Sequence, residues 1–285
     1  MTNSKPVNAY WGHHKCASTW INNILGRIFL DSGQIYTPVF TSQGFGEDLP
    51  GFLEKQKTDF LGYMNADFDH VRRANIGKSF HVVRDPRDIV VSGYFSHLHS
   101  HSVEGWPELA EHREQLKAVS KDEGLKLEME FERQFFEHMQ KWNYEQTNVL
   151  ELKMEDLTVR PFEGFLQIFE FIELIDENDL STKKRIKDLG IVLACKIRRR
   201  IGSLFPFTPR LARFPGERIL GAVYEKRFSK LAKGRKKGQE DATNHFRKGV
   251  KGDWKNHFTD QHKAYFKRDF NDLLLKLGYE NDGDW

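Results

Sequence analysis

The chain has 285 residues, of which 39% are hydrophobic and 13% aromatic, and its formal net charge is only +3. This composition is typical of a globular protein with a full hydrophobic core and excludes a disordered chain. The small net charge gives no reason to expect a nucleic-acid partner. Two cysteines, Cys16 and Cys195, are too few for a disulfide framework, and no apolar run approaches membrane-spanning length. We therefore expect a cytoplasmic protein with a single domain over residues 1–285.

The first stretch with recognisable chemistry is 13–20, His-His-Lys-Cys-Ala-Ser-Thr-Trp. It follows an apolar run at 7–11 that predicts a strand, and it precedes apolar residues at helical spacing over 21–30. A turn from strand to helix gathers free backbone N–H groups, and a lysine beside them adds a full positive charge. The stretch therefore predicts an anion site, although such a turn taken alone is more often structural. It is not a Walker A loop, because Lys15 lies three positions before Ser18 and no glycine precedes it.

Further strands and helices alternate along the chain. Apolar runs predict strands at 34–37, 59–64, 79–83 and 149–152. Helical spacing predicts helices at 67–73, from Pro86 onwards, at 131–144, at 161–172 and from about 259. This alternation predicts a three-layer α/β/α fold with a central, mostly parallel sheet. Ligands of such sheets bind at the carboxyl ends of the strands, so Lys15 and Arg84, which both follow strands, should lie at one edge.

The segment 181–220 departs from this pattern because it is strongly basic. It holds eleven basic residues against two acidic ones, a net charge of +9, with apolar residues interleaved. The pattern predicts a basic amphipathic helix followed by a proline-containing loop at 205–209. Three interpretations stay open: a solvated helix face, a lid over an anionic ligand, and weak contact with an anionic membrane surface.

Two later stretches indicate how the stretch at 13–20 should be interpreted. They are 80–96, which begins Phe-His-Val-Val-Arg-Asp-Pro-Arg-Asp, and 246–259, which begins Phe-Arg-Lys-Gly-Val-Lys-Gly-Asp-Trp-Lys. Together with 13–20 they resemble the three nucleotide-binding motifs of the sulfotransferases that use 3′-phosphoadenosine 5′-phosphosulfate (PAPS), in the order found in that family. The resemblance runs from Trp11 to Phe258. It implies a P-loop-like fold and an enzyme that moves a sulfuryl group from PAPS to a hydroxyl or amine of a small molecule, releasing adenosine 3′,5′-bisphosphate (PAP).

The resemblance also implies which residues hold PAPS. The 5′-phosphosulfate would lie against His14, Lys15, Cys16, Ala17, Ser18 and Thr19. The 3′-phosphate would lie against Arg84, Ser92, Arg247, Lys248 and Gly249. The adenine would lie between Trp20 and Phe228. Charged and hydroxyl side chains suit both ends, because PAPS is anionic at each of them.

Lys15 is the first candidate for a catalytic residue. Transfer of the sulfuryl group leaves growing negative charge on the departing phosphate oxygen, and an ammonium placed there stabilises it. The transferred group carries less charge than a phosphoryl group, so the reaction does not require a metal ion. The sequence offers no HExxH, CxxC or EF-hand pattern, and we expect no metal site.

The sequence departs from the family where the general base is expected. Cytosolic members place a histidine just after the strand that precedes the 3′-phosphate strand, and Asn65 stands at that position here. We rank His99 first as the replacement, because it lies seven residues after Ser92 and shares its helix face. His97 is second and Asp67 third.

Two further departures concern the adenine and the oligomer. Met154 stands where the family often has a tyrosine before Glu-Asp, and the family's dimer motif is matched only in part around Lys255 and Thr259. We therefore make no prediction of the oligomeric state. Two other functions are kept as alternatives: a magnesium-dependent P-loop kinase, and a non-enzymatic protein that binds anions or a membrane surface through 181–220.

Overall fold

The computed structural model describes residues 5–176, 182–202 and 209–285. Its centre is a five-stranded sheet in the order β2-β3-β1-β4-β5, and every neighbouring pair is parallel. The strands are β1 (Val7–Trp11), β2 (Tyr36–Val39), β3 (Phe60–Tyr63), β4 (Ile76–Val83) and β5 (Val149–Lys153). A two-stranded sheet of β6 (Ile175–Asp176) and β7 (Phe214–Pro215), which the sequence did not predict, completes the described strands.

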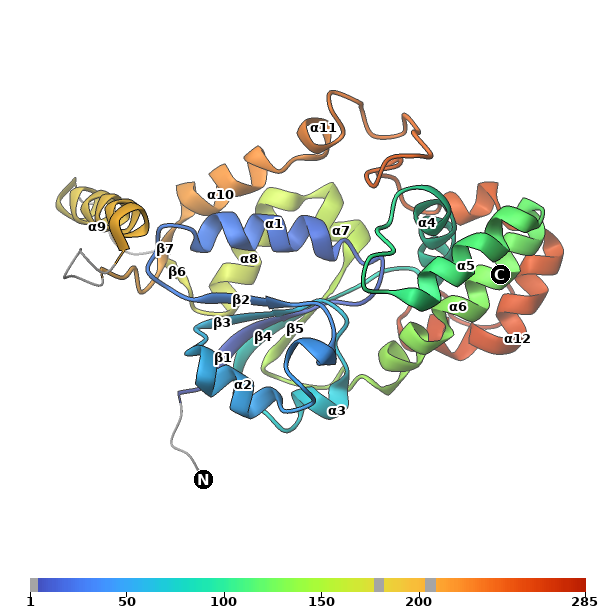
Figure 1. The fold of residues 1–285 in the computed structure, drawn as a ribbon, viewed down its shortest axis with the longest axis horizontal. Helices are drawn as coiled ribbons and strands as arrows, with labels where there is room; N and C mark the ends of the chain where they lie inside the picture. The colour runs from blue at the N-terminus through green and yellow to red at the C-terminus, as the bar shows by residue number, and fades with distance from the viewer. Residues whose placement is uncertain (1–4, 177–181, 203–208) are drawn as a thin grey trace.

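Helices cover both faces of the sheet (Figure 1). One face carries α1 (Ser18–Phe29), α8 (Pro161–Phe171) and α10 (Gly216–Glu225), and the other carries α2 (Leu49–Gln56) and α3 (Phe68–Val71). The predicted three-layer α/β/α fold is therefore confirmed. Helix α2 was not predicted.

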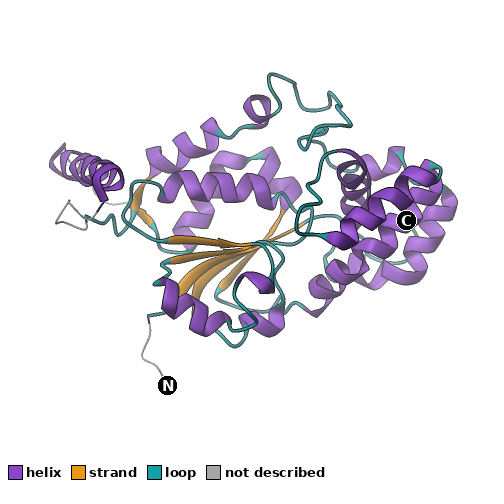
Figure 2. Ribbon diagram, viewed as in Figure 1, coloured by secondary structure: helices purple, strands orange, loops and turns teal. Residues whose placement is uncertain are grey.

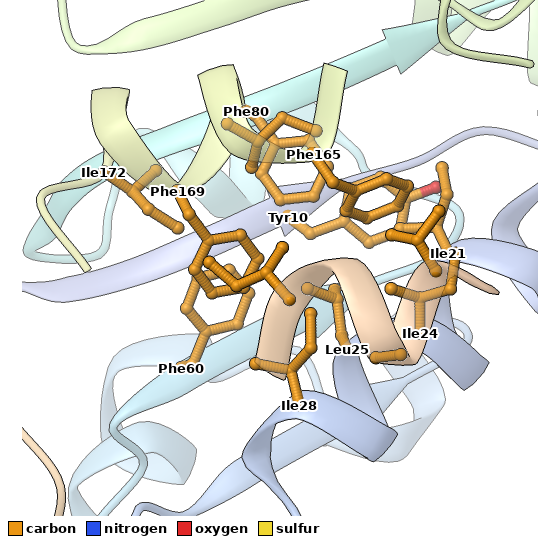
Figure 3. Close-up of a cluster of buried hydrophobic side chains, with 14 of the residues drawn as sticks. Tyr10, Ile21, Ile24, Leu25, Ile28, Phe60, Phe80, Phe165, Phe169 and Ile172 are labelled. Carbon is orange, nitrogen blue, oxygen red and sulfur yellow. The ribbon is translucent and has the colours of Figure 1, made fainter. Parts of the chain in front are cut away.

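The core between α1, α8 and the sheet follows directly from the sequence pattern. The predicted apolar stripe of α1 is buried, with Ile21, Ile24 and Leu25 each 0% exposed. These side chains meet aromatic residues from the strands and from α8 (Figure 3). Tyr10 of β1 stacks on Phe80 of β4 with ring centroids 4.8 Å apart. This packing holds the start of α1 against the sheet, next to the end of β1.

Beside the sheet lies a group of helices (Figure 2). It consists of α4 (Pro86–His99), α5 (Pro107–Ala118), α6 (Lys121–Lys141) and α12 (Asp260–Lys276). Helix α5 was not predicted, and α6 begins ten residues before the predicted start, at a capping box formed by Ser120 and Glu123. Gly278, just after α12, has a φ of 65°, as expected for a left-handed C-terminal cap.

Among the described residues, the remaining helices are α7 (Met154–Val159), α9 (Thr182–Ile201), α11 (Phe228–Leu231) and two 3₁₀ turns, η1 (Ser42–Gly44) and η3 (Asp253–Asn256). Helix α9 is the predicted basic helix, and Figure 1 shows it at one end of the molecule. The predicted loop at 205–209 lies outside the described residues except for its last position. Within the described part of the chain, no helix is long and apolar enough to cross a membrane.

The loop between β1 and α1 has an unusual backbone. Lys15 and Ala17 have φ angles of 56° and 61°, in the left-handed region that residues with a Cβ rarely occupy. Ala17 is the N-cap of α1 and makes no side-chain capping bond. The loop is therefore held in a conformation that costs free energy at Ala17 and would suit glycine.

We expect Ala17→Gly to stabilise the fold, because glycine reaches this φ without a steric penalty. The gain should be about 0.5–1 kcal/mol, which raises Tm by about 1–3 °C in a chain of this size. The matched control is Ala264→Gly at an exposed position inside α12. It should lower Tm, since glycine inside a helix costs about 1 kcal/mol relative to alanine. Equal losses in both variants, measured by thermal unfolding, would contradict the argument from strain.

Candidate active site

A pocket of about 650 Å³ opens at the carboxyl end of the sheet, where α1 begins. It is lined by residues from all three sequence motifs. Of the residues predicted to hold PAPS, Cys16 alone does not line it, because its side chain is fully buried behind the loop. Those that line the pocket are His14, Lys15, Ala17, Ser18, Thr19, Trp20, Arg84, Ser92, Phe228, Arg247, Lys248 and Gly249.

The first motif presents backbone N–H groups and one free ammonium. The first turn of α1 holds no acidic residue, so no carboxylate competes for its N–H groups. The Ser18 hydroxyl donates to the His13 carbonyl at 3.1 Å, which fixes the turn. Among the described residues, none forms a hydrogen bond or an ion pair with the Lys15 ammonium. Burial lowers the pKa of Lys15 to about 8, although the nearby carboxylate of Glu132 opposes this shift.

The second motif is joined to the first by Arg84. Its Nη1 donates to the carbonyl of Lys15 at 3.1 Å, so the guanidinium spans from the end of β4 to the β1–α1 loop. Its Nε is buried without a hydrogen-bond partner among the described residues. Ser92, two turns into α4, also faces the pocket. An anion between Arg84 and Ser92 would satisfy this unpaired donor.

The third motif is docked on α4 by one carboxylate. Asp88 accepts hydrogen bonds from the backbone N–H groups of Gly252 at 2.6 Å and of Trp254 at 2.9 Å. Asp88 is 1% exposed, so both bonds are shielded from water. The loop that carries Arg247 and Lys248 is therefore held against the start of α4, close to Arg84.

Within the third motif, Asp253 orients the two basic side chains. It accepts hydrogen bonds from Lys248, at 2.6 Å, and from Arg247. Burial would raise the pKa of Asp253, but the hydrogen bonds from Lys248, Asn256 and Arg247 hold it well below its usual range. Asp253 is therefore an anion that keeps both cations at the pocket wall, a role that the sequence analysis did not assign.

The predicted aromatic pair also lines the pocket. Trp20 is fixed by a 2.9 Å hydrogen bond from its Nε1 to the Lys226 carbonyl. Phe228 packs against Gly249, which has a φ of 67°, and a Cβ at this glycine would lie 2.7 Å from the Phe228 ring. Glycine is therefore required here both by the backbone and by the neighbouring ring. Met154 lines the pocket as well, in place of the family's tyrosine.

None of the three residues ranked as the general base lines the pocket. His99 is exposed at the end of α4, His97 is 0% exposed and lies against Glu128, and Asp67 caps α3. The argument from the helix face was wrong. Helix α4 is buried on most of its surface, so the spacing of seven residues between Ser92 and His99 does not place His99 at the pocket.

Other histidines reach the pocket instead. His13, His101 and His245 line it, and so does Asn65. Burial, followed by the positive charge of Lys15, lowers the pKa of His245 to about 4. His101 lies just past the end of α4 and belongs to the same sequence cluster as His97 and His99. The cluster therefore did indicate a histidine at the pocket. The sequence did not show which of the three it is, because the path of the chain after α4 could not be predicted.

Of the three interpretations of the basic segment, a lid over the pocket has no support in the described residues. No residue of α9 lines the pocket. Its ion pairs are to Asp31, to Asp176 and to Glu217, and Figure 1 places it at the end of the sheet opposite to the start of α1. The pocket lies at the carboxyl ends of the strands of the central sheet, and α9 lies at their opposite ends. Helix α9 is therefore too far from the pocket to cover it in this structure.

Comparisons with known proteins agree with this geometry. A family model described as a sulfotransferase domain matches residues 75–187. The fold is similar to that of the mouse sulfotransferase SULT7A1 complexed with PAP, at 17% identity and a TM-score of 0.56, over 94% of this chain and 84% of that one. Retinol dehydratase in complex with androsterone and inactive cofactor PAP is more distant, at 15% identity and a TM-score of 0.45, over 95% and 81% of the two chains. No curated protein matches the sequence.

The similarity of fold extends beyond the segment that the family model matches. The family model covers β4, α4 and the helices up to α9, and the similar fold covers nearly the whole chain. The first and third motifs, which lie outside the matched segment, line the same pocket as Arg84. No comparison favours a kinase. Residues 75–187 therefore resemble a sulfotransferase domain, and the chain as a whole shares its fold with a sulfotransferase.

Proposed function

We propose that this pocket binds PAPS in an extended form and transfers its sulfuryl group to a hydroxyl or amine of a small molecule. The observation that carries the proposal is the presence of two separate anion-binding groups in one pocket. One is the β1–α1 loop with Lys15, and the other is formed by Arg84, Arg247 and Lys248. A ligand with a single phosphate has no use for both groups, whereas PAPS is anionic at both ends.

In this proposal Lys15 acts on the leaving group. The acceptor oxygen or nitrogen forms a bond to sulfur and releases its proton to the solvent, while the bond from sulfur to the 5′-phosphate oxygen breaks and PAP leaves with the electron pair. The charge that grows on the phosphate oxygen is stabilised by the Lys15 ammonium and by the N–H groups at the start of α1. The ammonium makes no other bond among the described residues, so it is available for this role.

The acceptor would be bound by lining residues that are not assigned to PAPS. These include Phe40, Asn65 and His101. Phe40 is 60% exposed, which is unusual for a phenylalanine and leaves an apolar surface at the pocket. We infer an acceptor with an apolar body and one nucleophilic group, held between Phe40 and the transferred sulfuryl group.

The domain organisation and the compartment are also proposals. We propose that the chain is a single catalytic domain, since its main pocket is built from segments between residues 13 and 251. Cys16 and Cys195 are both free thiols and both buried, which suits a reducing cytoplasm.

Helix α9 carries a proposal about a partner. Its large apolar side chains at Ile186, Leu189, Leu193 and Ile197 recur at helical spacing and are 64%, 68%, 59% and 39% exposed. Exposed basic residues, such as Lys187 and Lys196, flank this apolar stripe. A helix with an exposed apolar face and basic flanks fits the boundary between headgroups and acyl chains of an anionic membrane. We propose weak, reversible contact of α9 with such a surface.

The experiment that tests the function is nucleotide binding followed by an acceptor screen. PAP should raise Tm in buffer without added metal, because a ligand bound only by the native state must stabilise it. Adenosine 5′-phosphate should raise Tm much less, since it has no 3′-phosphate to contact Arg84, Arg247 and Lys248. Incubation with labelled PAPS and a panel of phenols, alcohols and amines, read by mass, then identifies the acceptor. Equal stabilisation by both nucleotides would contradict the assigned 3′-phosphate site.

Two glycine variants sharpen this test. Gly249→Ala should weaken PAP binding at least about tenfold, because the added Cβ displaces Phe228. Gly252→Ala is the matched control: its φ of 71° imposes the same backbone penalty, but a Cβ there meets no atom within 4 Å. If both variants bind PAP equally well, Phe228 does not contact the nucleotide.

Lys15→Ala should lower kcat by about a hundred- to thousand-fold, as the loss of a donor to transition-state charge does elsewhere. The Kd for PAP should change far less, because Arg84, Arg247 and Lys248 remain. Lys117→Ala, which removes the same charge from the exposed surface of α5, should leave both quantities unchanged. A Lys15→Ala enzyme within about threefold of the normal kcat would remove this residue from the mechanism.

Sedimentation with vesicles tests the partner. The protein should sediment with vesicles of phosphatidylglycerol and phosphatidylcholine, and much less with phosphatidylcholine alone, because the basic flanks need anionic headgroups. The double variant Leu189→Ser and Leu193→Ser should lose this binding while keeping its response to PAP. Unchanged sedimentation of the double variant would show that α9 is a solvated helix.

A further inference from the structure

A cluster of buried histidines and glutamates lies beside the pocket, and the transfer reaction does not use it. His97 from α4, His112 from α5 and Glu128 from α6 meet where these three helices pack, and they are 0%, 4% and 0% exposed. One nitrogen or oxygen from each lies within 4.8 Å of the others. None of the three lines the pocket. Their positions are far apart in the sequence, so no spacing motif reveals them.

The contacts of His97 are not those of a hydrogen-bonded histidine. Its Nδ1 lies 2.8 Å from Glu128 Oε1, but neither atom has a hydrogen-bond partner among the described residues. Its Nε2 has none either. A neutral imidazole must carry an N–H on one nitrogen, and leaving that N–H buried and unpaired is costly. Because these atoms make no hydrogen bond among the described residues, they remain available as ligands for a cation.

The charge of the cluster points in the same direction. Glu128 is fully buried, and on the next turn of α6 Glu132 is fully buried too, bonded to His14 Nδ1 at 2.8 Å. Buried carboxylates are normally paired with a cation or bound to a metal. A metal ion bound by the neighbouring histidines would supply that charge.

The helix opposite leaves room for the carboxylates. Gly93 of α4 faces them, and a Cβ at this position would lie 2.2 Å from Glu128 Oε1 and 2.7 Å from Glu132 Oε1. The space at Gly93 is therefore filled by carboxylate oxygens in place of a side chain. Glu128 Oε2 is also held, by His112 Nε2 at 2.8 Å. Both oxygens of Glu128 are thus directed toward histidine nitrogens.

We propose that His97, His112 and Glu128 bind a divalent transition-metal ion of the zinc class. Two imidazoles and one carboxylate are a common ligand set for Zn²⁺. The ion fastens α4, α5 and α6 to one another and does not touch the nucleotide, so its role is structural. Because α4 begins at the 3′-phosphate motif, the ion also fixes the helix on which that motif is built.

Metal analysis of the full chain, purified without chelator, tests this proposal directly. We expect about one equivalent of zinc or a similar ion per chain. A strong chelator should remove it and lower Tm, and added Zn²⁺ should restore Tm. The metal-free chain should bind Co²⁺ with the visible absorption of a protein site that has nitrogen ligands. None of these measurements depends on sulfuryl transfer, so they succeed or fail independently of the proposed function.

Variants locate the ion. Glu128→Gln and His112→Gln should each lose the metal and the Co²⁺ spectrum, whereas Glu130→Gln, an exposed position on the same helix, should keep both. If the variants do not fold, the Co²⁺ titration of the unmodified chain decides. A folded, metal-free chain whose Tm does not change with chelator or with Zn²⁺ would overturn the proposal. The three residues would then form a hydrogen-bonded network without a metal ion. Retention of the full metal content in Glu128→Gln would do the same.

Discussion

The hydrogen bond from Arg84 to the carbonyl of Lys15 connects the two halves of the pocket, and the geometry of the site depends on it. It forms because β1 and β4 are adjacent and parallel, with Trp11 paired to His81 near their ends. The residues that follow these strands must then emerge at the same edge of the sheet. A change in this register would separate the loop proposed to hold one end of the nucleotide from the arginine proposed to hold the other.

The third motif comes from a distant part of the chain and needs its own attachment. Figure 1 shows the segment after α11 running across the end of α1 toward α4. This segment has almost no regular structure, so backbone hydrogen bonds within it cannot fix its position. Asp88 supplies the attachment through two backbone N–H groups, and Asp253 then orients Arg247 and Lys248. Two buried carboxylates thus assemble a site for an anion, because each is neutralised by donors from the same loop.

The parts that the sequence predicted are those that depend on local pattern. The apolar run at 7–11 and the stripe of α1 gave correct elements, since periodicity reports burial directly. The three motifs line one pocket because the first two follow adjacent strands and the third docks on α4. Helix α5 was missed because its apolar residues are few, and its stability comes from packing on α4 and α6. The histidine ranking failed for a related reason: which side of α4 meets the pocket is decided by α5, α6 and η3 around it, and no pattern within α4 contains that information.

The same helix joins the nucleotide site to the rest of the fold. The first turn of α4 carries Asp88, Ser92 faces the pocket one turn later, and His97 is buried among the helices near its end. A helix is stiff over this length, so whatever fixes His97 also fixes the direction in which Ser92 points.

The loop of the first motif, in contrast, is strained. Lys15 and Ala17 are held in conformations that the surrounding packing must impose. The packing of α1 on the sheet imposes them through Ile21 and Ile24, while α4 holds the other end. The pocket thus combines a strained loop that presents N–H groups with a rigid helix that sets the distance to the second anion site.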